Sequence, residues 1–73
     1  MGEKHPNIGI YLTNVGDIHR KKGDYKEAET TYFQAISTLS DSLGPEHIEV
    51  AEVLNSMGLV LKKVGEILNE LIH

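Results

Sequence analysis

"RKKGDYKEAETTY", residues 20 to 32, contains the end of one helix, a turn and the start of the next helix. Gly23 can adopt the left-handed backbone conformation that ends a helix at low cost. Asp24 is a preferred N-cap residue, and Glu27 follows three positions later, as in a capping box. The stretch therefore predicts a helical hairpin that turns at Gly23.

Apolar residues on both sides of this turn recur every three or four positions, which is the helical period. One helix is predicted over about residues 7–22, from Ile8, Tyr11, Leu12, Val15, Ile18 and His19. A second is predicted over about residues 25–42, from Ala28, Tyr32, Ala35, Ile36, Leu39 and Leu43. Strand-like alternation is absent from the sequence, so the expected fold class is all-α.

A second break, "LGPEH" at residues 43–47, ends the second helix. Gly44 is a natural C-cap residue, and Pro45 cannot continue a helix but can open the next one. A third apolar pattern then begins at Ile48 and runs towards the C-terminus. The sequence thus predicts a hairpin followed by a third helix.

Length, charge and composition restrict the function. The 73 residues suffice for one small domain, residues 1–73, and a chain this short is expected to need partners for stability. The net charge of −4 argues against nucleic acid and anionic membranes as partners, and no apolar run approaches the roughly 18 residues of a membrane span. Without cysteine, the chain suits the reducing cytoplasm, where we expect it.

Candidate catalytic and metal-binding residues lack the spacing that such chemistry needs. The four histidines form no recognisable ligand pattern. The helical serines Ser37, Ser40 and Ser42 have no base at a suitable distance in sequence. We therefore expect no enzyme activity, no cofactor and no metal. His5 and His47, which precede helices, are interpreted as capping or packing residues.

An internal repeat appears when the chain is shifted against itself by 42 positions. The shift pairs helix positions and turn glycines with identical residues: His5 with His47, Leu12 with Leu54, Gly16 with Gly58, Lys21 with Lys63, and Gly23 with Gly65. The first of the two units is the more regular one.

Residues 9–39 resemble the tetratricopeptide repeat, a pair of antiparallel helices that meet at small side chains. The residues that carry the resemblance are Leu12, Val15, Gly16, His19, Gly23, Asp24, Tyr25, Ala28, Tyr32 and Ala35. The extended connection "SLGPEH" and the 42-residue period look like the kinesin light chain type of these repeats. The resemblance implies a complete repeat over residues 7–43, an incomplete one over 46–73, and a fragment of an α-solenoid.

The resemblance also implies a groove that binds an extended peptide of a partner protein. The residues expected to face it are Thr13, Asn14, Asp17, Arg20 and Lys21 on the first helix, and Asn55, Ser56, Leu59, Lys62 and Lys63 on the third. In kinesin light chain-like repeats, paired asparagines on this face bind the peptide backbone. Here the pairs read Thr13-Asn14 and Asn55-Ser56, so half of each pair is kept. The lysines do not match the full carboxylate clamp of chaperone-binding members.

Five of the seven basic residues fall into two groups, residues 20–22 and 62–63. Cations near helix C-termini complement the helix dipole, which is sufficient to explain them. Repeat equivalence also stacks Arg20 on Lys62 and Lys21 on Lys63, which would form a basic ridge for an acidic segment of a partner. Both interpretations stay open at this point.

The second unit departs from the repeat where its second helix should begin. Ile67 stands in the place of Tyr25, and Glu70 in the place of Ala28. An ionised carboxylate at this tight contact would cost several kcal/mol, whereas Gly65 inside a helix costs only about 1 kcal/mol relative to alanine. One continuous helix is therefore predicted, from about Pro45 to Leu71.

The apolar pattern supports this prediction, because it passes through Gly65 in steps of four and three. Its members are Val50, Leu54, Met57, Leu61, Val64, Leu68 and Leu71, flanked by Val53, Val60 and Ile67. The second half of the helix would extend past the hairpin and leave Val64, Ile67, Leu68, Leu71 and Ile72 uncovered. We hypothesise self-association through these residues, as a symmetric homodimer or a higher oligomer, with exchange of helices as one route. The alternative is ordinary solenoid core with a frayed end.

Two classes of function follow. The chain can be a protein-interaction module that binds a protein or peptide, with self-association through its last helix. Alternatively, it can be a dedicated homo-oligomerisation element, or part of a longer solenoid, with no peptide binding of its own.

Overall fold

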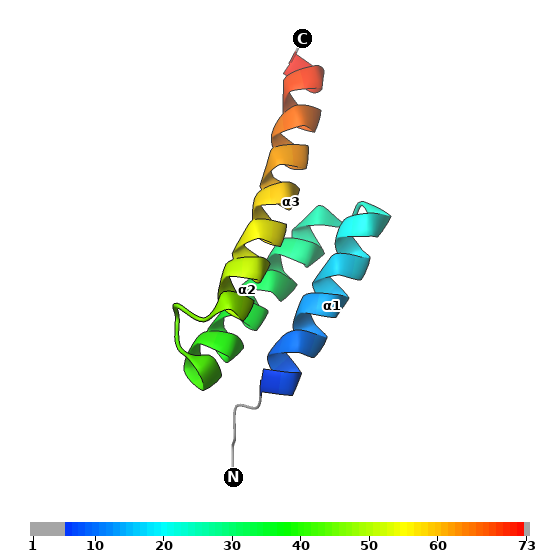
Figure 1. Ribbon diagram of the computed structural model, residues 1–73. Coiled ribbons are helices and arrows are strands. Elements are labelled where there is room, and N and C mark those ends of the chain that lie inside the picture. Colours follow the sequence, from blue (N-terminus) through cyan, green and yellow to red (C-terminus); the bar gives the residue numbers. More distant parts are fainter. Residues whose placement is uncertain (1–5, 73) are drawn as a thin grey trace.

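The computed structural model describes residues 6–72, which form three helices (Figure 1). Helices α1 (Pro6–Lys22) and α2 (Tyr25–Leu43) form an antiparallel hairpin, and α3 (Ile48–Ile72) lies against α2 and continues past it. The predicted all-α class is confirmed, and both hairpin helices begin and end within one residue of their predicted bounds. The predicted capping or packing role of His5 lies outside the described residues.

The hairpin turns at Gly23, whose φ of 86° is the left-handed conformation expected from the sequence. The backbone N–H of Asp24 donates to the carbonyl of His19 at 2.9 Å, which closes the end of α1. The predicted capping box is wrong, because the Asp24 side chain makes no capping hydrogen bond. Its carboxylate instead lies 3.8 Å from Nζ of Lys22, where an ion pair competes with the cap.

The second connection, Gly44 to His47, begins at Gly44 with a φ of 97°. Pro45 does not open α3 as predicted, because the helix begins three residues later, at Ile48. His47 caps α3 instead: its carbonyl accepts the N–H of Val50 at 3.0 Å, and its Nδ1 accepts the N–H of Glu49 at 3.1 Å. The capping interpretation of His47 is confirmed. The ring satisfies an amide that would otherwise lack a partner at the helix start.

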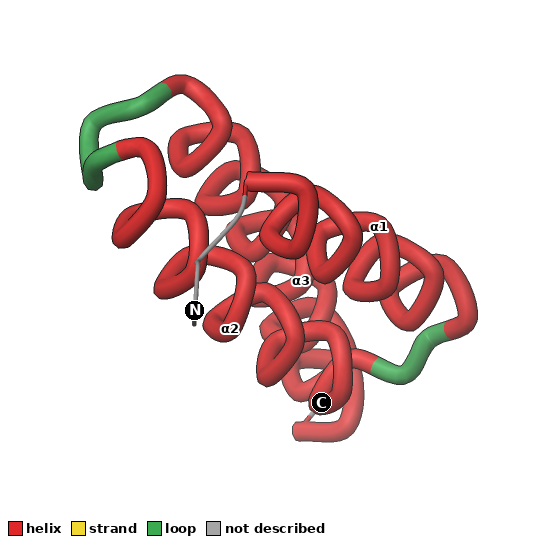
Figure 2. Tube along the Cα trace, turned by 90° about the horizontal axis from the view of Figure 1, so that it is seen from below, coloured by secondary structure: helices red, strands yellow, loops and turns green. Residues whose placement is uncertain are grey.

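The core is formed along α2, which contacts both other helices, whereas α1 and α3 barely touch. Its buried residues are Ala28, Tyr32, Ala35 and Leu39 on α2, and Val50, Val53, Met57 and Val60 on α3. Seen from below, the two connections lie at opposite ends of the hairpin, and the three helices run nearly side by side (Figure 2). α2 is therefore the element that positions α1 and α3 relative to each other.

Close contact between α1 and α2 depends on two glycines of α1. A Cβ atom added to Gly16 would lie 2.6 Å from the ring of Tyr32, and one added to Gly9 would lie 2.5 Å from Leu39. Real Cβ atoms do not approach other atoms so closely. The hairpin therefore places large side chains of α2 directly against the backbone of α1, as expected from the small residue at position 16.

A buried polar contact fixes the ring of Tyr32 over Gly16. The Tyr32 hydroxyl donates a hydrogen bond to Oδ1 of Asp17 and accepts one from Nε of Arg20 at 3.2 Å. Nη2 of Arg20 also lies 3.6 Å from Oδ1 of Asp17. Burial of the ring and the bond to Asp17 raise the pKa of Tyr32, and the hydrogen bond to Tyr32 raises the pKa of Arg20. Because the hydroxyl has both partners, it can be buried without a large penalty.

The packing stripe of α3 differs from the predicted one. Val53 and Val60, predicted as a flanking set, are buried, while Leu54, Leu61 and Leu68 of the predicted main stripe are about half exposed. The two sets lie side by side on the helix, and covering both would require two neighbouring helices. Only α2 is present, and it covers the valine side.

The prediction of a continuous third helix is confirmed, since α3 runs through Gly65 without a break. Its 25 residues correspond to about 37 Å at the usual rise of the α-helix. The described part of the chain is accordingly elongated, with extents of 51 × 21 × 14 Å. The last turns of α3 project beyond the hairpin (Figure 1).

Replacing Gly16 by alanine should lower the free energy of unfolding by about 1–3 kcal/mol, because the new methyl group must displace the ring of Tyr32. Chemical denaturation followed by circular dichroism measures this effect. Ser37→Ala, at an exposed position of α2, is the control and should change stability by less than about 0.5 kcal/mol. Equal stability of Gly16→Ala and the natural chain would contradict the close-contact account.

Tyr32→Phe should cost about 1–2 kcal/mol at neutral pH, because Asp17 and Arg20 both lose a partner. The raised pKa of Tyr32 adds a pH dependence. Its contribution to stability is complete below the ordinary tyrosine pKa of about 10 and is lost as the pH rises through the higher pKa of the folded state. Unfolding curves should therefore show a steeper alkaline loss for the natural chain than for Tyr32→Phe. Tyr11→Phe, at an exposed ring, should keep the steeper loss.

Candidate functional site

The ten predicted groove residues lie on α1 and α3, but they are not equally available. Four on α3 are exposed, namely Asn55, Leu59, Lys62 and Lys63, and Ser56 is half-buried. On α1, Asn14 and Lys21 are exposed, whereas Thr13, Asp17 and Arg20 are half-buried. The α3 side of the predicted groove is thus the more accessible one.

Several predicted groove residues of α1 have partners within the hairpin. Oγ1 of Thr13 donates to the carbonyl of Gly9 at 2.9 Å, so its hydroxyl hydrogen is occupied by its own helix. Asp17 and Arg20 hold the hydroxyl of Tyr32. Sequence analysis missed this contact, although a polar pair one and four positions after Gly16 is a usable signal for it. Asn14 is the α1 residue best placed to offer an exposed amide.

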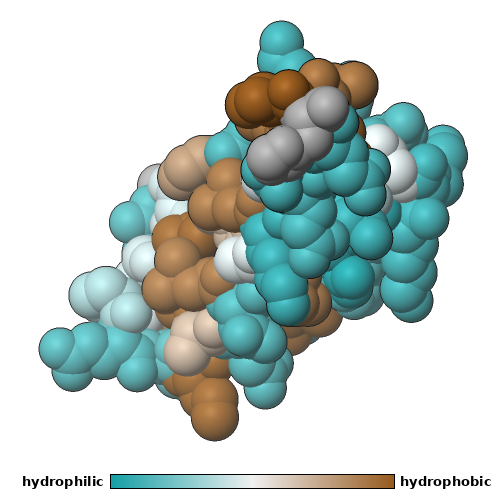
Figure 3. Space-filling model, turned by 90° about the horizontal axis from the view of Figure 1, so that it is seen from above, coloured by the Kyte–Doolittle hydropathy of each residue, from teal (hydrophilic) through white to brown (hydrophobic). Residues whose placement is uncertain are grey.

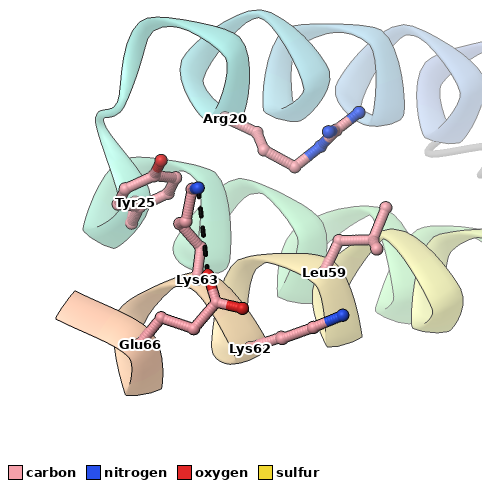
Figure 4. Close-up of a pocket in the computed structure, with 6 residues that line it drawn as sticks. All are labelled: Arg20, Tyr25, Leu59, Lys62, Lys63 and Glu66. Atoms are coloured by element: carbon pink, nitrogen blue, oxygen red, sulfur yellow. Dashed lines mark ion pairs between the residues drawn. The ribbon is translucent and has the colours of Figure 1, made fainter. Parts of the chain in front are cut away.

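An open pocket of about 400 Å³ brings four of the predicted residues together (Figure 4). Arg20 comes from α1, and Leu59, Lys62 and Lys63 come from two successive turns of α3. Three cationic side chains thus surround one apolar side chain. The remaining six predicted residues do not line this pocket: Thr13, Asn14, Asp17, Lys21, Asn55 and Ser56.

Two further residues line the pocket and were not predicted for it, Tyr25 at the start of α2 and Glu66 on α3. Glu66 lies three residues after Lys63, and their charged groups are 3.9 Å apart in an exposed ion pair. Such pairs contribute little to stability and exchange readily with a competing anion. Lys62 has no ion-pair partner among the described residues. The pocket therefore offers one unpaired cation, Lys62, and one weakly paired cation, Lys63, while Arg20 is held by Tyr32 and Asp17.

The predicted self-association residues occupy the projecting end of α3. Val64 is half-buried and contacts the core of its own chain, so the expectation that it is uncovered is wrong. Val64 packs against the buried cluster, as does Tyr25 at the start of α2. Ile67, Leu68, Leu71 and Ile72 are exposed. In the space-filling view, apolar surface forms a band across the visible face, with hydrophilic surface on both sides of it (Figure 3).

Other kinds of site find little support in residues 6–72. No group of three acidic, histidine or cysteine side chains in this range could hold a metal ion. No helix in this range is both long and apolar enough to cross a bilayer.

Comparison with known proteins places the chain in a family. The sequence model of the tetratricopeptide repeat matches residues 7–67, which covers all of α1 and α2 except Pro6 and most of α3. Neither a curated protein nor a solved structure matches the chain. The antiparallel hairpin with a glycine against an aromatic ring agrees with the repeat pattern on which the resemblance rested. The chain therefore belongs to the tetratricopeptide repeat family.

Proposed function

We propose that the chain is a protein-interaction module whose pocket between α1 and α3 binds an extended acidic segment of a partner protein. The observation that carries this proposal is the arrangement of Arg20, Lys62 and Lys63 around Leu59. Domains of this family generally bind proteins or peptides, so the proposal is consistent with the family of the chain.

Four of the six lining residues of the pocket have distinct roles in this proposal. Lys62 and Lys63 attract carboxylates of the bound segment, and Leu59 contacts an apolar side chain between them. The exposed ion pair between Lys63 and Glu66 is weak, so Lys63 exchanges Glu66 for a carboxylate of the bound segment. Exposed amides at Asn14 and Asn55 are available to hydrogen-bond the backbone of the segment.

Three finer assignments belong to the same proposal. The 42-residue spacing between Gly16 and Gly58, and the extended connection between α2 and α3, support the kinesin light chain-like type of repeat. The absence of cysteine supports a location in the cytoplasm. We assign the chain no catalytic role, because its pocket is open to solvent and a binding function accounts for the charged residues in it.

Charge reversal at Lys62 should weaken binding of an acidic peptide about tenfold or more, which the loss of about 1.4 kcal/mol would produce. The probe is a fluorescein-labelled peptide of alternating glutamate and leucine, measured by fluorescence anisotropy. Affinity for the natural chain should fall with added salt, because the pairs formed are exposed to solvent.

Lys26→Glu is the matched control, because it makes the same change of net charge at an exposed position of α2 away from the pocket. It should weaken binding far less than Lys62→Glu. Equal losses in the two variants would show that only net charge matters, and the pocket would then be rejected as the binding site.

A second candidate function is self-association through α3, favoured by the exposed residues at its projecting end. Leu71 and Ile72 are 76% and 81% exposed, which is costly for apolar side chains in a chain of this size. A symmetric homodimer, with or without exchange of helices, would bury them. This function and peptide binding use different faces of α3 and do not exclude each other.

Sedimentation velocity from low to high micromolar concentration tests self-association. The natural chain should change from monomer towards dimer, and the double variant Leu71→Glu, Ile72→Glu should stay monomeric over the same range. The control, Ser37→Glu on α2, should dimerise like the natural chain. A natural chain that stays monomeric at every concentration would rule out this function and leave the peptide pocket untouched.

A further inference from the structure

One exposed face of α3 has a pattern that neither the core nor the pocket uses. Small residues alternate with leucines along it, in steps of three and four, and we call this face the small–leucine stripe. Its members are Ala51, Leu54, Gly58, Leu61, Gly65 and Leu68, and all of them are exposed. The stripe lies beside the buried residues Val50 and Met57. Of the pocket residues of α3, Leu59 and Lys63 lie well away from it, and Lys62 lies at its edge.

The hairpin shows how this chain packs such a face. On α1, Gly9 and Gly16 are seven residues apart, and each receives one large side chain of the antiparallel α2. The side chains that fill these positions, Leu39 and Tyr32, are also seven residues apart. The packing unit of the hairpin is therefore a row of small residues on one helix and a row of large residues on the other.

The stripe also carries small residues at the repeat-equivalent positions. Ala51 corresponds to Gly9, Gly58 to Gly16 and Gly65 to Gly23. Among residues 6–72, no side chain fills the two glycine positions, since a Cβ atom added to Gly58 or Gly65 would have no neighbour within 4 Å. α3 thus retains the face that a following antiparallel helix would cover, although the chain continues straight on at Gly65.

The stripe also carries large residues, like those of α2 that pack against the small residues of α1. Leu54, Leu61 and Leu68 are seven residues apart, like Tyr32 and Leu39, and expose 52%, 52% and 53% of their surface. α3 therefore contains both halves of the packing unit that α1 and α2 divide between them. A second copy of α3 is complementary to the first.

Only one relative direction and register of two α3 helices places every leucine of the stripe opposite a small residue. When two copies of α3 lie antiparallel, with the twofold axis between Leu59 and Val60, every leucine faces a small residue. Leu61 then faces Gly58 of the second copy, Leu54 faces Gly65, and Leu68 faces Ala51. A parallel pair without offset instead places leucine against leucine and leaves the glycines facing each other.

We propose that the small–leucine stripe binds the same stripe of a second copy of this chain in this antiparallel register. The second α3 takes the place of the fold-back helix that the second repeat lacks, and the interface continues the core across Met57 and Val64. The stripe itself carries no charge, and the pairing extends over about 26 Å of each helix at 1.5 Å per residue. The proposal rests on the self-association proposed above and specifies its geometry, with Leu68 inside the paired segment and Leu71 and Ile72 just beyond its end.

Distances between spin labels test the register. Since the chain has no cysteine, Asn55→Cys and Asn69→Cys each provide one labelling position per copy, both at the same exposed edge of the stripe. With a rise of 1.5 Å per residue and helix axes 8–10 Å apart, the proposed register predicts about 16 Å between the Cα atoms of the two Asn55 positions and about 30 Å between those of Asn69. A parallel pair predicts about 10 Å for both.

A substitution at Gly58 tests the packing. Gly58→Leu should raise the dimer dissociation constant roughly tenfold or more, because the added side chain occupies the space that Leu61 of the second copy fills. Within one chain the change meets no steric obstacle and improves helix propensity, so the monomer should be at least as stable as the natural one. Ser37→Leu adds the same side chain to an exposed position of α2 and should leave the dissociation constant unchanged.

The outcomes separate this inference from the function on which it rests. Loss of dimer in Gly58→Leu together with the long Asn69 distance supports it. A tighter dimer in Gly58→Leu indicates non-specific apolar association and overturns the inference. Two short label distances also overturn it. In both cases the proposed self-association itself stands. A natural chain that is monomeric at all concentrations overturns both the stripe interface and the self-association. If that monomer binds an added apolar helical peptide, the stripe is assigned to a different partner.

Discussion

The contact between Tyr32 and Gly16 is the constraint on which the rest of the structure depends. It brings α1 and α2 so close that any side chain at position 16 would have to displace the ring, and hydrogen bonds from Arg20 and to Asp17 keep the ring in place. With the hairpin fixed, Ala28, Ala35 and Leu39 of α2 join the buried residues of α3 in one cluster. The separation of α1 and α3, and hence the pocket between them, is a consequence of this packing.

The second repeat unit keeps the packing glycine, at Gly58, but has no second helix folded back against it. Gly58 occupies the position of Gly16, but the residues that should return as a second helix continue α3 instead. Glu70, which would stand at the tight contact in place of Ala28, is exposed to solvent in the extended helix. In the hairpin, the small residues of α1 are covered by α2. The matching small residues of α3 have no such helix, so the apolar surface around them stays exposed.

Local signals predicted most of the fold. The turn at Gly23, the bounds of α1 and α2, and the passage of α3 through Gly65 depend on glycine conformation, helical period and the cost of burying Glu70, all of which can be read from sequence. The side of α3 that faces α2 could not be read in this way, because Val53 and Leu54 lie on adjacent faces and both repeat every seven residues. The roles of Asp17 and Arg20 were missed for a related reason: groove positions came from the repeat pattern, while their hydrogen bonds to Tyr32 depend on how closely two helices approach.

The central claim is that α3 continues through Gly65 and leaves its small–leucine face without a covering helix from its own chain. Backbone chemical shifts and short-range proton contacts from solution NMR test this directly at residues 62–72. Our account predicts helical Cα shifts throughout this segment, a negative φ at Gly65, and contacts between Val64 and Ile67 that are typical of one helix. Coil-like shifts with a positive φ at Gly65, as Gly23 has, together with contacts between Glu70 and Gly58 of the same chain, would contradict it.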